Sequence, residues 1–330
     1  MKKFISIMLC LILAASLFTG CSKASDNKKL NIVTTIFPVY DWVREILGEE
    51  GENAELTLLL DNGVDLHSYQ PTADNIVKIA SCDIFIYVGG HSDEWVSDVL
   101  AQATNKDMVV INLFEVLGDA VKEEEIVEGM EHEKSEEHDH EDEDDHDEVH
   151  VHEEDEHIWL SLRNAKVACK EIAEKLCVIN PENEESYRGN VKEYCAKLDT
   201  LDKEYQNAVN KAPTKTLLFG DRFSFRYLTD DYGITYYAAF TGCSAESEAS
   251  FETVAFLAGK MDELKLKNIM IIEGSDGSIA KTINDTTTAK NAKVLTLNSM
   301  QTTTSADVNN GTTYLSIMES NLAVLTEALN

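Results

Sequence analysis

Apolar positions along the chain follow two different periods, and the segments that carry them alternate. Runs rich in β-branched residues predict strands, and segments with apolar positions three and four residues apart predict helices. The first half has predicted strands at 30–36, 55–60, 83–90 and 108–113, with helices at about 38–47, 72–80 and 94–103. The second half has strands at 215–220, 234–240, 268–274 and 293–297, with helices at 223–231 and at about 251–264, 277–288 and 313–328. This alternation favours parallel sheets covered by helices.

Between the two series, the pattern from 164 to 212 is almost wholly helical, with a break at the sequence NPENEE. The later part carries one continuous apolar stripe at helical spacing. We therefore predict an α/β fold with two Rossmann-like lobes, each with a parallel four-stranded sheet, joined by a long rigid helix. The predicted parts are an N-terminal lobe at 30–118 that ends with 157–180, a linking helix at 181–212 and a C-terminal lobe at 213–330.

Residues 119–156 do not fit either lobe. From 122 to 157 there are 20 acidic residues and two lysines, which contribute −18 to the formal charge of −32. Such a segment cannot bury enough apolar surface to fold, and we predict a disordered, acidic, histidine-rich loop. The overall negative charge also argues against nucleic acid as a partner.

The N-terminus has the features of an export signal. Two lysines precede an apolar run that is too short to span a membrane, and residues 17–21, LFTGC, resemble the lipobox of bacterial lipoproteins. That resemblance implies a signal peptide at 1–20, a lipid on Cys21, a polar tether at 21–29 and a place on the extracytoplasmic face of the cell membrane. The alternative is a plain secretory signal with an incidental cysteine.

Motifs for common enzyme chemistry are missing. The sequence has no GxGxxG, GxxxxGK[ST], HExxH or GxSxG. Five cysteines remain after Cys21, without a CxxC pair, so no disulfide framework is indicated. We expect no enzyme activity. A secreted metal-dependent hydrolase stays open as an alternative, with Glu246, Glu248 or Glu273 as its base.

Three histidines stand at positions where the pattern predicts order. His67 and His91 follow the ends of predicted strands, where parallel sheets bind their ligands, and His157 borders the apolar pair Ile158-Trp159. Each could be a metal ligand, although an isolated loop histidine is more often solvated. His91 could instead cap the helix that starts near Asp93.

The sequence "DLHSYQPTADNIVKIASCDIFIYVGG", an acidic histidine-rich tract and "DEHIWLSLRNA" follow one another in this order. Together they resemble the zinc-uptake solute-binding lipoproteins of ABC importers (cluster A-I, ZnuA/AdcA-like). The resemblance extends over about 30–329. It implies that His67 and His157 bind Zn²⁺ in a cleft, and that a monomeric protein delivers the ion to an ABC permease and its ATPase.

The chain departs from this family at two further ligand positions, where it has Arg222 and Asn298. Arginine has no lone pair for a metal. The missing donors could be Asp221, Cys243 or Glu246, since a thiolate suits zinc. Alternatively, Arg222 pairs with Glu246 or Glu248 and locks its lobe.

The loop could collect metal for this site. Its histidines and carboxylates can bind divalent ions weakly, and the negative field concentrates cations. The histidines concerned are His132, His138, His140, His146, His150 and His152. The competing interpretation is a solubilising loop. A manganese- or iron-binding protein of the same fold and a surface zinc buffer also remain open.

Overall fold

Strands from the two halves of the chain form two separate parallel sheets. The computed structural model describes residues 29–131, 153–244 and 248–330. In the N-terminal lobe the sheet contains β1 (Leu30–Thr34), β2 (Ala54–Leu58), β3 (Ile84–Tyr87) and β4 (Val109–Asn112). In the C-terminal lobe it contains β5 (Thr216–Phe223), β6 (Thr235–Thr241), β7 (Asn268–Ile272) and β8 (Lys293–Leu297). The strand orders, β2-β1-β3-β4 and β6-β5-β7-β8, are equivalent. The predicted pair of four-stranded parallel sheets is confirmed.

Helices cover the sheets and connect the lobes. They are α2 (Phe37–Leu47), α3 (Ala73–Ser81), α4 (Val96–Ala101), α5 (Leu113–Leu117), α6 (Leu162–Ile179), α7 (Glu184–Lys211), α8 (Arg226–Tyr232), α9 (Phe251–Leu264), α10 (Ser278–Thr286), α11 (Ser305–Asn309) and α12 (Tyr314–Ala328). The pattern did not predict α5 and α11, because five residues are too few to show a helical period.

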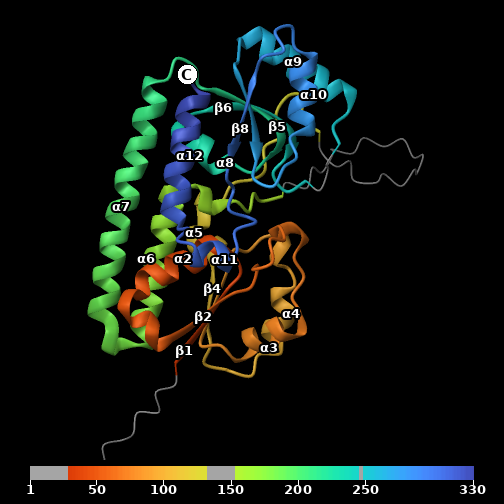
Figure 1. Cartoon of the computed structure of the whole chain (residues 1–330). Helices are drawn as coiled ribbons and strands as arrows, with labels where there is room; N and C mark the ends of the chain where they lie inside the picture. The colour runs from red at the N-terminus through yellow and green to blue at the C-terminus, as the bar shows by residue number, and fades with distance from the viewer. Residues whose placement is uncertain (1–28, 132–152, 245–247) are drawn as a thin grey trace, which may run out of the picture.

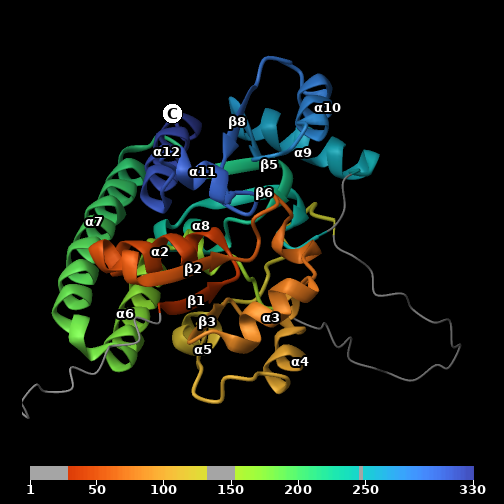
Figure 2. The same ribbon diagram turned by 60° about the horizontal axis from the view of Figure 1, so that its bottom comes forward.

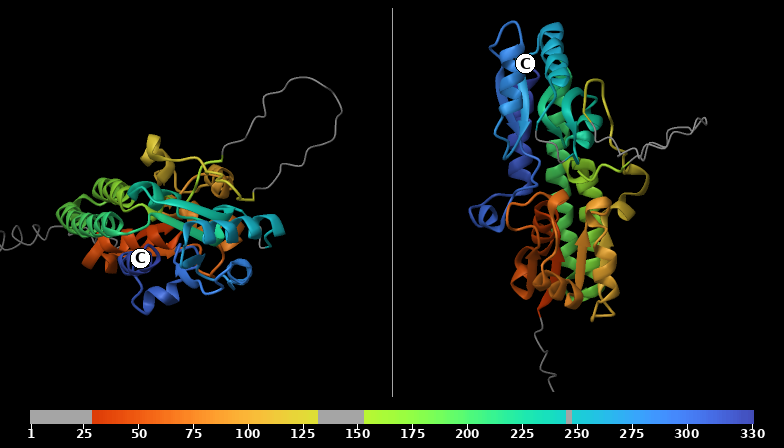
Figure 3. Two further views of the ribbon diagram at one scale, coloured as in Figure 1. Left: turned by 90° about the horizontal axis from the view of Figure 1, so that it is seen from above. Right: turned by 90° about the vertical axis from the view of Figure 1, so that its right-hand side faces the viewer.

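The long helix α7 joins the lobes as predicted. Figure 1 shows it along one side of both, and the right-hand view of Figure 3 shows the lobes one above the other. The helix contacts α2, α6 and α12, and α12 lies beside it also in Figure 2. Its apolar stripe includes the buried Tyr187, Tyr194 and Tyr205, and the Tyr205 hydroxyl donates to the Met318 carbonyl of α12 at 2.6 Å. Buried aromatic packing along one face explains why a largely polar helix stays continuous.

The acidic loop prediction differs from the structure at both ends. Residues 119–131 and 153–156 are described, and Glu123 pairs with Glu154 in an antiparallel bridge. Glu131 pairs with Phe240 at the edge of β6. Asp155 and Glu156 are buried. Asp155 accepts hydrogen bonds from the backbone N–H and Nδ1 of His157, and Glu156 accepts one from the backbone N–H of Ser92; charge counting along the sequence does not reveal these contacts. Residues 132–152 lie outside the described part, with all six predicted metal-collecting histidines.

The predicted signal peptide and Cys21 also lie outside the described residues. Within residues 29–131, 153–244 and 248–330, no helix combines the length and apolar character needed to cross a membrane. The five cysteines in this part of the chain are unpaired. Cys169 and Cys177 are buried in α6.

Candidate metal site

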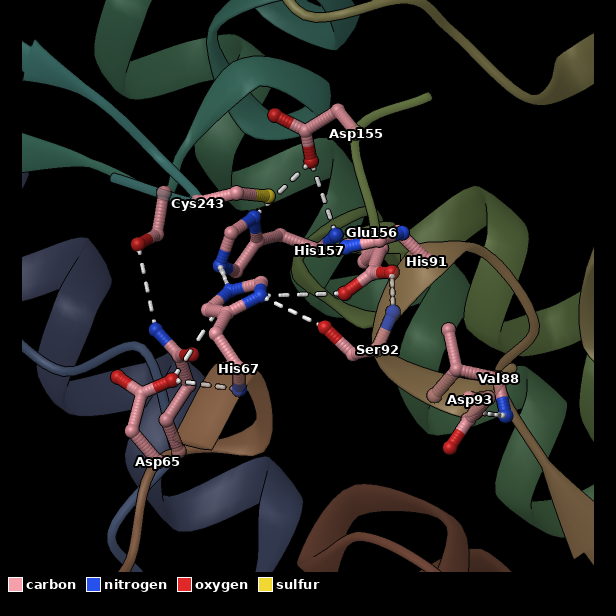
Figure 4. Close-up of polar contacts among 12 residues, drawn as sticks. Asp65, His67, Val88, His91, Ser92, Asp93, Asp155, Glu156, His157 and Cys243 are labelled. Carbon is pink, nitrogen blue, oxygen red and sulfur yellow. Dashed lines mark hydrogen bonds and ion pairs between the residues drawn. The ribbon is translucent and has the colours of Figure 1, made fainter. Parts of the chain in front are cut away.

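Three loops at the facing ends of the two sheets bring His67, His157 and Cys243 together. His67 lies in a 3-10 turn (Leu66–Ser68) after β2, His157 immediately precedes another (Ile158–Leu160), and Cys243 follows β6. One possible ligand atom from each lies within 4.8 Å of the other two. Figure 4 shows the two imidazole rings side by side with the thiol next to them. In the described residues this is the one group of three or more such side chains that could hold a metal.

The Nε2 atoms of the two rings face each other. Nε2 of His67 lies 3.4 Å from Nε2 of His157. On the opposite side of each ring, Nδ1 lies against a carboxylate: Glu156 Oε2 is 3.2 Å from His67, and Asp155 Oδ1 is 3.1 Å from His157. An Nδ1–H that donates to a carboxylate leaves the Nε2 lone pair free. Two lone pairs at this distance repel unless a proton or a metal cation lies between them.

Asp155 orients the His157 ring and favours its protonated form. Its Oδ1 accepts hydrogen bonds from both the backbone N–H and Nδ1 of His157, at 2.9 and 3.1 Å. The ring is fully buried. Burial lowers the pKa of His157, but the nearby charges of Asp155, Asp65 and Glu156 outweigh that effect and raise the pKa above its ordinary value. The pocket therefore favours a positive charge at this ring.

Glu156 and Ser92 hold the other ring. The Ser92 hydroxyl lies 2.9 Å from Nδ1 of His67, and the Ser92 backbone N–H donates to Glu156 at 2.7 Å. Burial acts to raise the pKa of Glu156, but hydrogen bonds from His67 and Ser92 lower it overall, so the carboxylate is ionised. Gly90, with φ of +84°, makes this possible, because a Cβ there would lie 2.5 Å from Glu156 Oε1. Glu156 therefore orients His67 from a buried position.

The loop after β6 carries the third donor. Cys243 is half-buried, and its backbone N–H donates to Glu124 Oε1 at 2.9 Å. Burial and the neighbouring acids, with Glu124 first among them, raise the pKa of its thiol well above the usual value. The preceding Gly242 lets this loop approach His157, because a Cβ there would lie 3.0 Å from Cε1 of that ring. The thiol would lose its proton on binding a metal.

Of the other two predicted lobe-two donors, only Asp221 lies in the described residues, and it has structural partners, as does Asn298 at the altered family position. Asp221 lies at an irregularity of β5 and accepts the backbone N–H groups of Arg222 and Ile272, at 2.8 and 3.3 Å. It is not part of the three-residue cluster. Asn298 accepts the Met300 N–H at 2.7 Å and so holds a residue with φ of +66°. Glu246 lies outside the described residues.

In the described part of the chain, Arg222 pairs with an acid other than Glu248. Its Nη2 lies 2.7 Å from Asp65 Oδ2, which belongs to the opposite lobe. Glu248 is exposed, and Glu273 accepts hydrogen bonds from Ser299 and Gln301. The predicted pairing with Glu248 is therefore wrong, and the ion pair of Arg222 connects the two lobes.

The third sequence candidate histidine lies outside the cluster. His91 is largely exposed, and its Nδ1 lies 2.9 Å from the side-chain oxygen Oε1 of Glu94. The predicted capping role is wrong, because neither the 3-10 turn that begins at His91 nor α4 has a side-chain cap.

Sequence reasoning missed the carboxylates that contact the two candidate histidines. A repeated signal could have found two of them, since both histidines occur as Asp-x-His. In each case the aspartate accepts the backbone N–H of the histidine: Asp65 for His67 at 3.0 Å and Asp155 for His157 at 2.9 Å. Glu156 and Ser92 had no such signal, because their contact with His67 joins residues far apart in the chain.

Comparisons with known proteins give one matching family and several relatives. Residues 32–328 match the family described as "Zinc-uptake complex component A periplasmic", ZnuA. The zinc-binding lipoprotein AdcA of Streptococcus pneumoniae is 31% identical over 327 residues, which cover 98% of this chain and 60% of AdcA. The chain therefore spans about 60% of the length of the AdcA relatives. The high-affinity zinc uptake system protein ZnuA of Bacillus subtilis is 31% identical, over 98% of this chain and 96% of that protein.

Solved structures agree in fold. The Zn(II)-bound ZnuA-like domain of Streptococcus pneumoniae AdcA has a TM-score of 0.69 at 27% identity and covers 91% of this chain and 99% of that one. The metal-dependent lipoprotein YcdH of Bacillus subtilis has a TM-score of 0.71 at 27% identity, with the same coverage.

Proposed function

The chain belongs to the ZnuA family of zinc-uptake proteins, and from this premise we propose that it captures Zn²⁺ between its lobes and delivers it to an ABC importer. His67, His157 and Cys243 are the proposed ligands. The observation that carries the proposal is the convergence of two carboxylate-oriented imidazoles and one thiol from both lobes. No bond chemistry is involved.

The histidine geometry suits a tetrahedral ion. Two nitrogens at about 2.0–2.1 Å from zinc, with a tetrahedral angle between them, lie about 3.3 Å apart. The separation between the two Nε2 atoms is 3.4 Å. Glu156 and Asp155 supply the carboxylate partners that metal-bound imidazoles commonly have.

The donor set favours zinc over manganese. Imidazole and thiolate suit Zn²⁺, whereas Mn²⁺ prefers an oxygen-rich shell. One oxygen of the Asp65 carboxylate is already engaged, because its Oδ2 pairs with Arg222 of the other lobe. With three protein donors, water or Glu246 would complete the fourth position. Manganese should therefore bind far more weakly.

The proposal also includes the location and the partners of the protein. Cys21 would carry a lipid that holds a monomer at the extracytoplasmic face of the membrane. A permease and its ATPase would be the partners, and the histidine-rich loop would collect zinc near the site. Release would require the transporter to separate the lobes, against the packing of α7 with α2, α6 and α12.

A metal titration tests the central claim. The chain without residues 1–21 is titrated with Zn²⁺ and Mn²⁺ against a competing chelator, beside His67→Ala, Cys243→Ser and a variant without 132–152. Each ligand substitution should weaken zinc binding about 100-fold or more, because four-ligand zinc sites contribute about 10–16 kcal/mol. The exposed His91→Ala is the matched control and should bind normally. Unchanged binding by His67→Ala, or loss of the tight site in the loop deletion, would refute the proposed site.

A further inference from the structure

One arginine contacts both of the loops that carry the proposed ligands. Arg222 lies at the carboxyl end of β5, in the C-terminal lobe. Its Nη2 forms an ion pair with Asp65 Oδ2 at 2.7 Å, and its Nη1 donates to the Ser244 carbonyl at 3.3 Å. Asp65 is two residues from His67, and Ser244 follows Cys243 directly. A single planar guanidinium therefore spans the gap between the two lobes.

Asp65 links the ion pair to His67, a proposed ligand. While Asp65 Oδ2 accepts from Arg222, its Oδ1 accepts the His67 backbone N–H at 3.0 Å. Burial acts to raise the pKa of Asp65, but Arg222 and His67 lower it below its usual value, so the carboxylate remains charged. Arg222 has no lone pair and cannot itself bind a metal. Its contacts therefore affect where the His67 and Cys243 loops hold their donor atoms.

A second contact holds the same loop from the opposite lobe. Asp61, at the start of the loop between β2 and α3, accepts the Ser305 hydroxyl at 2.6 Å and also the Ser305 backbone N–H. Ser305 is the first residue of α11. The C-terminal lobe therefore contacts the His67 loop through both Ser305 and Arg222. Of these two residues, Arg222 also contacts the Cys243 loop.

We propose that Arg222 is a positioning residue for metal capture, which fixes the spacing between His67 on one lobe and Cys243 on the other through Asp65 and Ser244. The inference rests on the proposed zinc function. Without this link, the two loops sample a wider range of separations, and closing the site around the ion costs conformational freedom. The affinity then falls although every ligand is still present.

The test compares Arg222→Gln, Asp65→Asn, the double variant and Arg222→Lys in the otherwise complete lipid-free chain. Arg163→Gln is the matched control, because Arg163 of α6 also pairs across the lobes, with Asp231, but contacts neither ligand loop. The measurements are zinc affinity and release rate by chelator competition, thermal unfolding in the presence of a chelator, and the thiolate-to-metal absorption of the Co²⁺ form.

Arg222→Gln and Asp65→Asn should each weaken zinc binding about 10-fold, and the double variant should lose no more than the larger single loss, because both remove one link. The cobalt–thiolate absorption should weaken in Arg222→Gln. Arg222→Lys should recover part of the affinity, since an ammonium can pair with Asp65 but lacks the fork that also reaches Ser244. The control should stay within twofold of wild type.

Wild-type affinity in Arg222→Gln, fully additive losses, or an equal loss in Arg163→Gln would overturn the inference while the proposed function stands. A wild-type chain without a tight, His67-dependent zinc site would refute the proposed function and the inference with it.

Discussion

Asp155→Asn changes the charge beside His157 and little else. The carboxylate is buried, and Oδ1 accepts both the backbone N–H and Nδ1 of His157. An asparagine oxygen at this position can accept the same two hydrogen bonds. The backbone of residue 155 is held independently, since its N–H donates to the Lys122 carbonyl at 2.8 Å and its carbonyl accepts the Tyr227 hydroxyl at 2.7 Å. The ring should therefore keep its orientation.

The expected loss of zinc affinity is 10- to 100-fold, or about 1.4–2.7 kcal/mol. Across the His157 ring the Asp155 charge lies about 6–7 Å from an ion on Nε2, and one unit charge at this distance from another contributes about 2–3 kcal/mol at an effective dielectric constant near 20. Part of this is offset, because Asp155 also raises the pKa of His157 and so strengthens the competing proton. The net value agrees with the effect usually seen when a carboxylate partner of a metal-bound histidine is removed.

Competition titrations at pH 8.0, 7.0 and 6.0 measure both parts of this effect. The ratio of wild-type to Asp155→Asn affinity should shrink as pH falls, because the wild-type ring, with its raised pKa, protonates first. Asp41→Asn is the matched control: this buried carboxylate on α2 accepts the Tyr314 N–H and pairs with Arg44. Its zinc affinity should stay within twofold of wild type. Equal affinities of Asp155→Asn and wild type at pH 8.0 would refute the argument that Asp155 acts on the metal through His157.

Two further outcomes follow from the same site. Gly242→Ala should lower the free energy of unfolding by about 1–3 kcal/mol and weaken zinc binding, since its Cβ would lie 2.7 Å from the Phe223 carbonyl oxygen and 3.0 Å from the His157 ring. Thermal unfolding with and without zinc would detect both effects. Wild-type values in both measurements would mean that the loop can move aside freely. Zinc binding should release about one proton at pH 8, from the Cys243 thiol with its raised pKa, and more as pH falls and His157 protonates, so that affinity decreases towards low pH. Calorimetry in buffers of different ionisation enthalpy counts these protons, and no release at pH 8 would exclude Cys243 as a ligand.

Much of the fold could be predicted because it depends on local patterns. Alternating β-branched and helical segments indicated two parallel sheets, and the aromatic stripe from Tyr187 to Tyr205 indicated one long helix. The short helices α5 and α11 and the ordered ends of the acidic segment were missed. In the latter case Asp155 accepts hydrogen bonds from His157, two residues later, and Glu156 accepts one from the distant Ser92; composition does not show either contact.

The sequence by itself supplied the candidate donors: imidazoles at His67 and His157 beside ordered segments, and Asp221, Cys243 or Glu246 as alternatives in the second lobe. Tertiary structure alone decided which donors meet. Only the folded chain places Cys243 beside the two rings, turns Asp221 towards backbone N–H groups and pairs Arg222 with Asp65. The physical reason is that a metal site requires ångström-scale spacing between loops on different lobes. Residue type is a local property of the chain, whereas this spacing is fixed by packing across the whole molecule.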